Sequence, residues 1–375
     1  MKKSLFLLFL LAVGLITLYS CSKSSGTPDP DPVKGFDKTA MLANYADNLI
    51  IPGYSDMQAK MNTLQAAAEL FLNAPSVTTL NALKAPYLES YLQYQRIEAF
   101  QFGPADIALL TTFLNFSGGL DYNFSTAGEF TGFSVDTLTI ENNISTGTYE
   151  LATISRSSFY TQGFTALEYL FFSPGALEKF ADNTAARKQY VRDVLSRMKT
   201  LVDKVSSDWT TYRSVFIGNT KTDVGSPIAF LVNQLAYQMD LLKGPRIGWP
   251  LGKQSNGIIF PAKCEGYYSG ISMALAIENL KNIKALYTGA ESDKSISGYL
   301  KALKKETLDT DVLVQFTSTT EKLALIPNPL SASLSNAPLL VGNAYKEIQK
   351  LQTLIKADVA SATNVQITFN DNDGD

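Results

Sequence analysis

The segment from residue 163 to residue 172 reads Gly163-Phe164-Thr165-Ala166-Leu167-Glu168-Tyr169-Leu170-Phe171-Phe172. One face of a helix over this segment, with i, i+3, i+4 and i+7 spacing, carries Phe164, Leu167, Glu168 and Phe171. Apart from the glutamate this face is apolar, which predicts a helix that faces the protein core. A carboxylate at a core position is costly to desolvate unless it is paired, hydrogen-bonded or bound to a metal. We therefore expect Glu168 to have a partner or a raised pKa.

Amphipathic helical spacing continues through most of the chain. Apolar residues recur every three or four positions in the segments 41–71, 80–98, 191–209, 230–242, 271–287, 296–305, 308–325 and 338–361. Ser76 is a candidate N-cap, Ser226 precedes Pro227 at a first helical position, and Gly289 is placed to end a helix. Pro52 predicts a kink or break in the first of these segments. The pattern indicates helical bundles.

Two long segments lack a sustained helical period. Residues 118–149 are rich in Gly, Asn, Ser and Thr, which predicts a long excursion with little regular structure. Within it, residues 135–140 alternate between apolar and polar types, which is compatible with a short strand. Residues 243–266 are predicted to form the second long loop. Such loops in a compact domain usually have a functional role or pack over a site.

The N-terminus has the features of an export signal. Lys2 and Lys3 precede an apolar run from residue 5 to residue 18, which is too short to span a bilayer. It ends at Leu18-Tyr19-Ser20-Cys21, which is similar to a bacterial lipobox. Residues 1–20 are thus predicted to be a lipoprotein signal peptide, and acylated Cys21 to anchor the mature chain to a lipid bilayer. Residues 21–35 are rich in Ser, Gly, Pro and Asp and are predicted to be a flexible tether.

The composition limits the partners, active-site types and metals that the chain is expected to use. The chain has 32 basic and 35 acidic residues and a formal net charge of −3, which argues against nucleic acid as a partner. It contains no histidine, which excludes Ser-His and Cys-His dyads and histidine-based zinc sites. Any metal would be a hard cation such as iron or calcium, held by oxygen ligands. Cys264 is expected to be a packed residue, because no histidine exists to activate it as a nucleophile.

Several motifs resemble one known family. Residues 163–168 resemble the Gly-x-His-x-x-Glu signature of the imelysin family, with Thr165 in place of the histidine. Residues 96–104, Arg-Ile-Glu-Ala-Phe-Gln-Phe-Gly-Pro, resemble its Glu-Ala-Phe-x-Phe-Gly-Pro segment. Residues 264–269 are similar to its Glu-Ser-x-Tyr/Phe-Ser stretch, and residues 369–375 to its Phe-Asn-x-x-Asp-Gly-Asp ending. The family includes insulin-cleaving membrane proteases and the periplasmic component of a ferrous-iron uptake system.

The resemblance covers nearly the whole mature chain and implies an all-α fold. It implies two related helical-bundle domains, predicted here as residues 36–180 and 181–375, with the signature site at their interface. Positions i and i+3 share a helix face, so Thr165 lies beside Glu168 but supplies only a weakly coordinating hydroxyl. The motif includes Gly163, and the ligand- or metal-binding candidates are Glu98, Thr165, Glu168, Arg246, Glu265 and Ser269.

Three functions follow from these expectations. The first is a lipoprotein of a bacterial envelope, with the outer membrane favoured, that binds a metal-bearing or small polar ligand in an interdomain carboxylate cleft. The second is a peptidase in which Glu98 and Glu168 act as an acid and base pair. The third is a catalytically silent scaffold in which Arg96, Arg156 or Arg246 neutralises Glu168.

Overall fold

The computed structural model describes residues 33, 35–117, 132–181 and 184–369. Residues from Asp37 onward form one compact unit. Helices account for its regular structure and the described ranges contain no strand, which confirms the all-α prediction. Within the same ranges, no helix has both the length and the apolar content needed to cross a membrane. The predicted signal peptide, Cys21 and the acidic tail from residue 370 lie outside the described residues.

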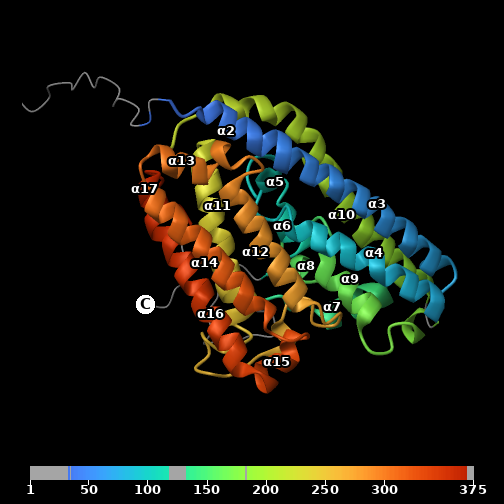
Figure 1. The fold of residues 1–375 in the computed structure, drawn as a ribbon. Helices are drawn as coiled ribbons and strands as arrows, with labels where there is room; N and C mark the ends of the chain where they lie inside the picture. Colours follow the sequence, from blue (N-terminus) through green and yellow to red (C-terminus); the bar gives the residue numbers. More distant parts are fainter. Residues whose placement is uncertain (1–32, 34, 118–131, 182–183, 370–375) are drawn as a thin grey trace, which may run out of the picture. The chain divides into compact units, whose positions relative to one another are not determined.

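The first group of long helices surrounds α3. It comprises α2 (Lys38–Tyr45), α3 (Ile51–Asn73), α4 (Val77–Gln95) and α10 (Thr184–Gly218). α3 packs against both α4 and α10, and Figure 1 shows the three running side by side. A π-helical turn, Ala46–Ile50, joins α2 to α3. Pro52 lies in the first turn of α3, directly after the π-helical turn. A proline is tolerated in the first turn of a helix, so the chain remains helical here.

The second group contains four further long helices. They are α11 (Pro227–Leu241), α12 (Ser272–Thr288), α14 (Glu306–Ala324) and α16 (Pro338–Thr353). α14 packs on α16 and α12, and α11 packs on α12 and α16 (Figure 1). α12 also contacts α4, which connects the two groups. The shorter helices α13 (Ile296–Ala302), α15 (Leu330–Asn336) and α17 (Ala360–Ala362) and a π-helical segment, Leu354–Val359, complete this part of the chain.

Short helices form the described chain between α4 and α10, and most of them contact α10. They are α5 (Pro104–Ile107), α6 (Leu110–Leu114), α7 (Thr137–Thr146), α8 (Arg156–Phe159) and α9 (Gly163–Phe172). Residues 135–140, whose alternation was compatible with a short strand, instead lead into α7, because Asp136 caps this helix by accepting a hydrogen bond from Thr139 N. The predicted loop over residues 243–266 contains a π-helical segment, Leu242–Gly248, and a 3₁₀ turn, Pro261–Lys263.

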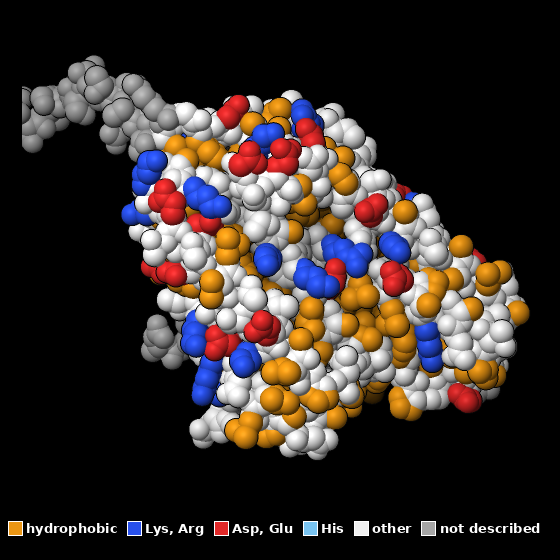
Figure 2. Space-filling model, in the orientation of Figure 1, with side chains coloured by type: hydrophobic (Ala, Val, Ile, Leu, Met, Phe, Trp, Pro, Cys, Tyr) orange, Lys and Arg blue, Asp and Glu red, His pale blue; other side chains and the backbone are white. Residues whose placement is uncertain are grey.

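The predicted helix signals act as expected. Ser76 forms a capping box with Thr79 at the start of α4, and Ser226 caps α11 ahead of Pro227. Gly289, with a φ of 62°, ends α12. Apolar packing supplies the core, and the apolar stripe on α10 is buried from Val191 to Trp209. Figure 2 shows lysines and arginines next to acidic side chains on the surface, where ion pairs contribute little to stability.

Candidate functional site

The first element of the site is α9, which begins at a glycine that no other residue can replace without strain. Gly163 has a φ of 76°, a region that disfavours side chains. A Cβ atom at this position would lie 2.3 Å from the carbonyl oxygen of Leu114, at the end of α6. The glycine of the motif therefore permits a close contact between α6 and the start of α9.

Aromatic side chains of α4 fix α9 from the other side. The ring of Phe164 stacks on Tyr91, with centroids 4.5 Å apart and an interplanar angle of 2°. The Tyr87 hydroxyl donates to the carbonyl oxygen of Phe164 at 2.9 Å. Tyr87 and Tyr91 of α4 thus hold the buried face of α9 in a fixed orientation.

Glu168 lies on this buried face and is only 3% exposed. Its Oε1 accepts hydrogen bonds from the backbone N–H of Ser269, at 2.9 Å, and from the Ser269 hydroxyl. Burial raises the pKa of Glu168 to about 7, although the bonds from Ser269 and the backbone of Tyr268 lower it. Both expected features, a partner and a raised pKa, are therefore present. The partner is a serine and its backbone.

A cavity of about 190 Å³ opens beside Glu168. Thr165 and Glu168 line it together, as their i and i+3 spacing predicts. The opposite walls come from the segments before α7 and α12; they are formed by Phe133, Ser134, Val135, Thr137, Ala262, Lys263, Tyr267 and Tyr268. Burial lowers the pKa of Lys263 below its usual value. The cavity thus has hydroxyl, carboxyl and amino groups on its walls, and its volume is below the range typical of drug-sized ligands, which limits a ligand to a small size.

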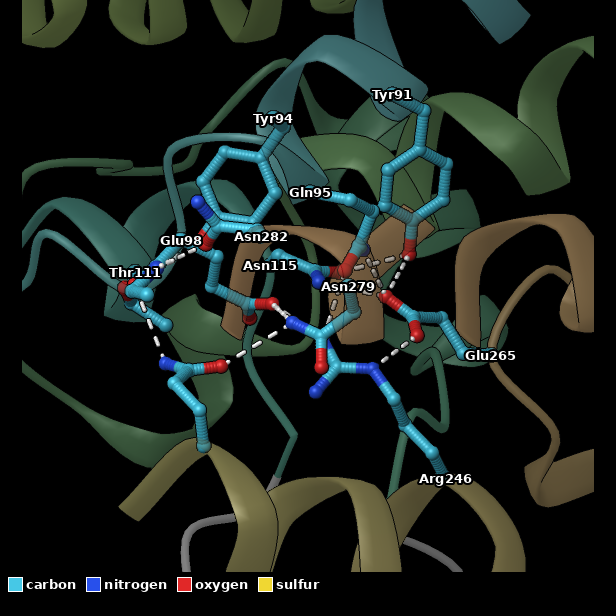
Figure 3. A network of polar contacts seen from close by, with 12 residues as sticks. Tyr91, Tyr94, Gln95, Glu98, Thr111, Asn115, Arg246, Glu265, Asn279 and Asn282 are labelled. Carbon is cyan, nitrogen blue, oxygen red and sulfur yellow. Dashed lines mark hydrogen bonds and ion pairs between the residues drawn. The ribbon is translucent and has the colours of Figure 1, made fainter. Parts of the chain in front are cut away.

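A buried ion network forms the second part of the site. Arg246, in the π-helical segment after α11, donates through Nε to Glu265 at 2.7 Å and through Nη2 to Glu98. All three side chains are at most 2% exposed. Figure 3 shows the guanidinium group between the two carboxylates. Glu98 is therefore a buried carboxylate whose counter-ion is Arg246.

Neutral side chains add further hydrogen bonds to this network (Figure 3), although Arg246 Nη1 and Asn279 Oδ1 are buried without a partner. Glu265 Oε1 accepts from Gln95 at 2.7 Å, from Asn115 at 2.8 Å and from the Tyr91 hydroxyl at 3.1 Å. Asn279 donates to Glu98 at 3.0 Å. Burial raises the pKa of Glu98 to about 7, against the opposing effect of the arginine. Burial alone would lower the pKa of Arg246, but the two carboxylates raise it above its usual value.

The two parts are adjacent but chemically distinct. The charge of Glu265 contributes to the raised pKa of Glu168, so the two carboxylates lie within electrostatic range. Glu98 is not among the described residues lining the Glu168 cavity, so Glu98 and Glu168 do not face a common space there. The arginines expected to neutralise Glu168 bond elsewhere, because Arg96 pairs with Glu278 and Arg246 with the network. Arg156 bonds to Tyr160.

The donor set does not suit a resident metal ion. The described residues contain no group of three or more acidic or cysteine side chains that could hold one. Hard cations take six or more oxygen ligands, usually with several carboxylates. At the cavity Glu168 is accompanied by hydroxyl groups, and Lys263 shares the same walls. Cys264 is buried, and burial raises its pKa to about 12, which leaves it a packed and unreactive residue.

Sequence reasoning missed several polar members of the site. Gln95 lies three residues before Glu98, at the end of α4. This spacing could have identified it as a neighbour of Glu98. Asn279 and Gln238 interrupt apolar stripes of α12 and α11, and both are fully buried. A buried amide in an apolar stripe requires a partner, so these positions could have been identified. Asn115 and Lys263 follow no such pattern.

Comparisons with known proteins place the fold among those of known relatives. The model of the family described as Imelysin matches residues 50–364. Iron-regulated protein A of Synechococcus elongatus is 22% identical over 338 residues, covering 86% of this chain and 83% of that protein. A crystal structure of a protein assigned as an iron-regulated protein A precursor from Parabacteroides distasonis has a TM-score of 0.71 at 22% identity, covering 91% of this chain and 97% of its own. An imelysin-like protein from Psychrobacter arcticum has a TM-score of 0.68 at 19% identity, covering 90% and 99%.

Proposed function

Because this chain belongs to the imelysin family, we propose that it is an envelope-anchored binding protein, related to iron uptake, that takes a small polar ligand in the cavity beside Glu168. The observation that carries the proposal is the position of Glu168. It is a buried carboxyl group at the wall of a cavity of about 190 Å³, and it is oriented by Ser269 from a distant part of the chain. A group held in this way is preorganised to hydrogen-bond a ligand.

A ligand site between two halves of the chain is part of this proposal. Glu168 and Thr165 belong to the proposed N-terminal half, residues 36–180. Ser269 belongs to the proposed C-terminal half, residues 181–375. The hydrogen bond between Ser269 and Glu168 crosses this division. In the proposal a ligand in the cavity touches residues of both halves, and the Arg246 network serves as the rigid support behind it.

The link to iron rests on the relatives that carry the name iron-regulated protein A. Since the donors around Glu168 do not suit a bare cation, we propose that iron arrives already coordinated by the ligand. The pKa of Glu168, raised by burial to about 7, leaves its carboxyl able to donate or accept a hydrogen bond near neutral pH. A hydroxyl- or carboxylate-bearing chelator offers matching groups.

The location belongs to the same proposal. Acylation of Cys21 would attach the chain to a bilayer, and residues 21–35 would tether it there. The outer membrane of a bacterial envelope is the location that we favour. Nucleic acid is not an expected partner, because the chain has a net charge of −3.

Calorimetric titration tests the binding site. Citrate, ferric citrate, ferrous ion and calcium ion are each titrated into the wild type and into Glu168→Gln. We expect saturable binding of citrate or ferric citrate, at least tenfold weaker in the variant, because a hydrogen bond to a charged ligand is worth about 1.5–3 kcal/mol. Glu89→Gln is the matched control, since Glu89 is a surface carboxylate paired with Lys60. Identical binding of every probe by the wild type and Glu168→Gln would exclude the proposal.

A peptidase is the second candidate, favoured by one observation. The pKa of Glu168, raised to about 7, suits a general base acting on water. The acid would have to be a group other than Glu98, because Glu98 is bonded to Arg246. Casein cleavage that disappears in Glu168→Gln would support this function. Cleavage that persists unchanged in the variant would identify a contaminating protease.

A further inference from the structure

A second cavity lies among α5, α6, α11 and residues 368 and 369. Its volume is about 470 Å³, more than twice that of the Glu168 cavity. The two cavities share no described lining residue. The segment from Glu98 to Pro104 connects the second cavity to the Arg246 network, because Glu98 binds Arg246 and Gln101 to Gly103 line the cavity.

Aromatic rings form much of its wall. Five such residues line it, namely Phe102, Phe116, Phe230, Tyr237 and Phe369. The rings of Phe102 and Phe230 are nearly parallel, with centroids 5.8 Å apart and an angle of 9°. Those of Tyr237 and Phe369 meet edge to face at 5.5 Å. Walls of this kind favour a ligand with a flat, apolar ring.

Amide side chains provide the polar part of the wall. Gln234 donates through Nε2 to the backbone oxygen of Gln101 at 3.1 Å. Gln234 Oε1 and Gln101 Nε2 are buried without a hydrogen-bond partner. An unmade hydrogen bond at a buried polar atom raises the free energy of the protein, and a ligand that supplies the partner lowers it. One acceptor and one donor are thus available to a ligand after rotation of these side chains. A carboxamide group matches both.

The cavity is shaped by specific backbone features. Leu109, between α5 and α6, has a φ of 51° and lies in the left-handed region, which is costly for a leucine. Gly103 has a φ of 56°, and a Cβ atom there would lie 2.4 Å from the ring of Tyr212. Both residues line the cavity. Strained backbone conformations of this kind concentrate at functional sites.

The wall near residue 369 is held in place by Asn233 of α11. Its Oδ1 accepts from the backbone N–H of Thr368 at 2.8 Å, and its Nδ2 donates to the carbonyl oxygen of Gln366 at 3.0 Å. This double contact places Phe369 over Tyr237. Asp106 is the charged member of the described lining, and a carboxylate at this place disfavours anionic ligands.

We propose that this second cavity binds a small uncharged aromatic molecule with a carboxamide-type group, whose ring packs against Phe230 and whose amide bonds to Gln101 and Gln234. The site is separate from the Glu168 cavity and does not depend on the function proposed there. Its ligand is recognised by ring stacking and amide pairing, whereas the Glu168 cavity recognises hydroxyl or carboxyl groups.

Ligand-observed NMR titration of the full chain with benzamide tests this site. We expect saturable binding that is about tenfold weaker in Gln234→Leu, which removes the amide at nearly constant volume. Thr112→Phe, at a half-buried lining position, should block binding by filling the cavity. Cyclohexanecarboxamide, which keeps the amide and lacks the aromatic ring, should bind several-fold more weakly than benzamide.

Glu168→Gln is the control and should bind benzamide as the wild type does. Thermal unfolding of each variant confirms that it is folded. Absence of saturation with the wild type would overturn the proposal. So would benzamide binding that is unchanged in both folded variants, Gln234→Leu and Thr112→Phe. Loss of benzamide binding in Glu168→Gln would place the probe at the Glu168 cavity and would equally overturn the second site.

Discussion

The backbone N–H of Ser269 donates to Glu168 Oε1 at 2.9 Å, and the Ser269 hydroxyl donates to the same oxygen. The two residues are 101 positions apart in the chain. Their hydrogen bonds favour the ionised carboxylate, whereas burial favours the protonated form. The pKa of Glu168, raised by burial to about 7, is the outcome of these opposing effects. Ser269 therefore influences both the position and the charge of the buried glutamate.

Replacement of Ser269 by alanine should destabilise the protein in a pH-dependent way. At pH 8 Glu168 is mainly ionised, and loss of the hydroxyl donor should cost about 1.5–3 kcal/mol of unfolding free energy. At pH 5 the carboxyl is protonated, and the cost should be smaller. Urea unfolding at the two pH values measures both. Ser214→Ala is the control, because the Ser214 hydroxyl is exposed and bonds to a backbone oxygen. Equal losses for Ser269→Ala at pH 5 and pH 8 would contradict this explanation.

Glu168→Gln should make the protein less sensitive to rising pH. Because the pKa of Glu168 in the folded state is raised from 4.5 to about 7, the unfolded chain releases its proton first as pH increases. The contribution of Glu168 to stability is thus greatest below pH 4.5 and is lost as pH rises to 7. Between pH 5 and pH 8 the unfolding free energy of the variant should gain about 2–3 kcal/mol relative to the wild type. A constant difference across this range would show that Glu168 titrates normally.

Arg246→Met should be strongly destabilising. The substitution leaves Glu98 and Glu265 buried without their cation, and breaking a buried pair from one side costs about 3–5 kcal/mol. Chemical denaturation at pH 7 measures the loss. The neutral combination Arg246→Met with Glu98→Gln and Glu265→Gln removes all three charges and should recover part of it. If the triple variant is less stable than Arg246→Met alone, the hydrogen bonds of the two carboxylates matter more than their charge.

Comparison of Gly163→Ala with Gly147→Ala should separate the cost of a steric clash from the cost of a left-handed backbone conformation. The new Cβ would clash with the Leu114 oxygen, which lies 2.3 Å away. The variant also has the cost of an alanine at a φ of 76°. Gly147 provides the matched control, because its φ is 66° and a Cβ there meets no atom within 4 Å. Gly147→Ala should cost about 1–2 kcal/mol, the penalty of a left-handed residue. The thermal midpoint should fall further for Gly163→Ala, and similar midpoints would mean that α6 and α9 can move apart.

Local sequence signals predicted the helices well. Caps at Ser76, Ser226 and Gly289 act within a few residues of themselves, so the sequence around each is sufficient to identify it. Local signals also decide the structure of residues 135–140, where a short strand was considered and a helix begins. The alternation there is short, whereas the Asp136 cap and the buried pair Ile140 and Ile144 define a helix.

Long-range pairing could not be predicted in the same way. Glu98, Arg246, Glu265 and Ser269 were all named as candidate site residues from the sequence, but their partners depend on how distant helices pack. Arg246 bonds to a glutamate 148 positions away, and Ser269 bonds to Glu168 across 101 positions. Periodicity assigns a side chain to the core without naming its neighbour. For this reason the sequence indicated buried carboxylates and left their counter-ions open.

Tyr91 has a mechanical consequence for the site. Its ring lies flat on Phe164 of α9, and its hydroxyl donates to Glu265 of the ion network. One rigid side chain of α4 thus spans the distance between the helix that carries Glu168 and the carboxylate that binds Arg246. A shift of α9 would alter either the stacked ring or the bond to Glu265. Tyr91 therefore connects the position of α9 directly to that of the Arg246 network, without an intervening residue.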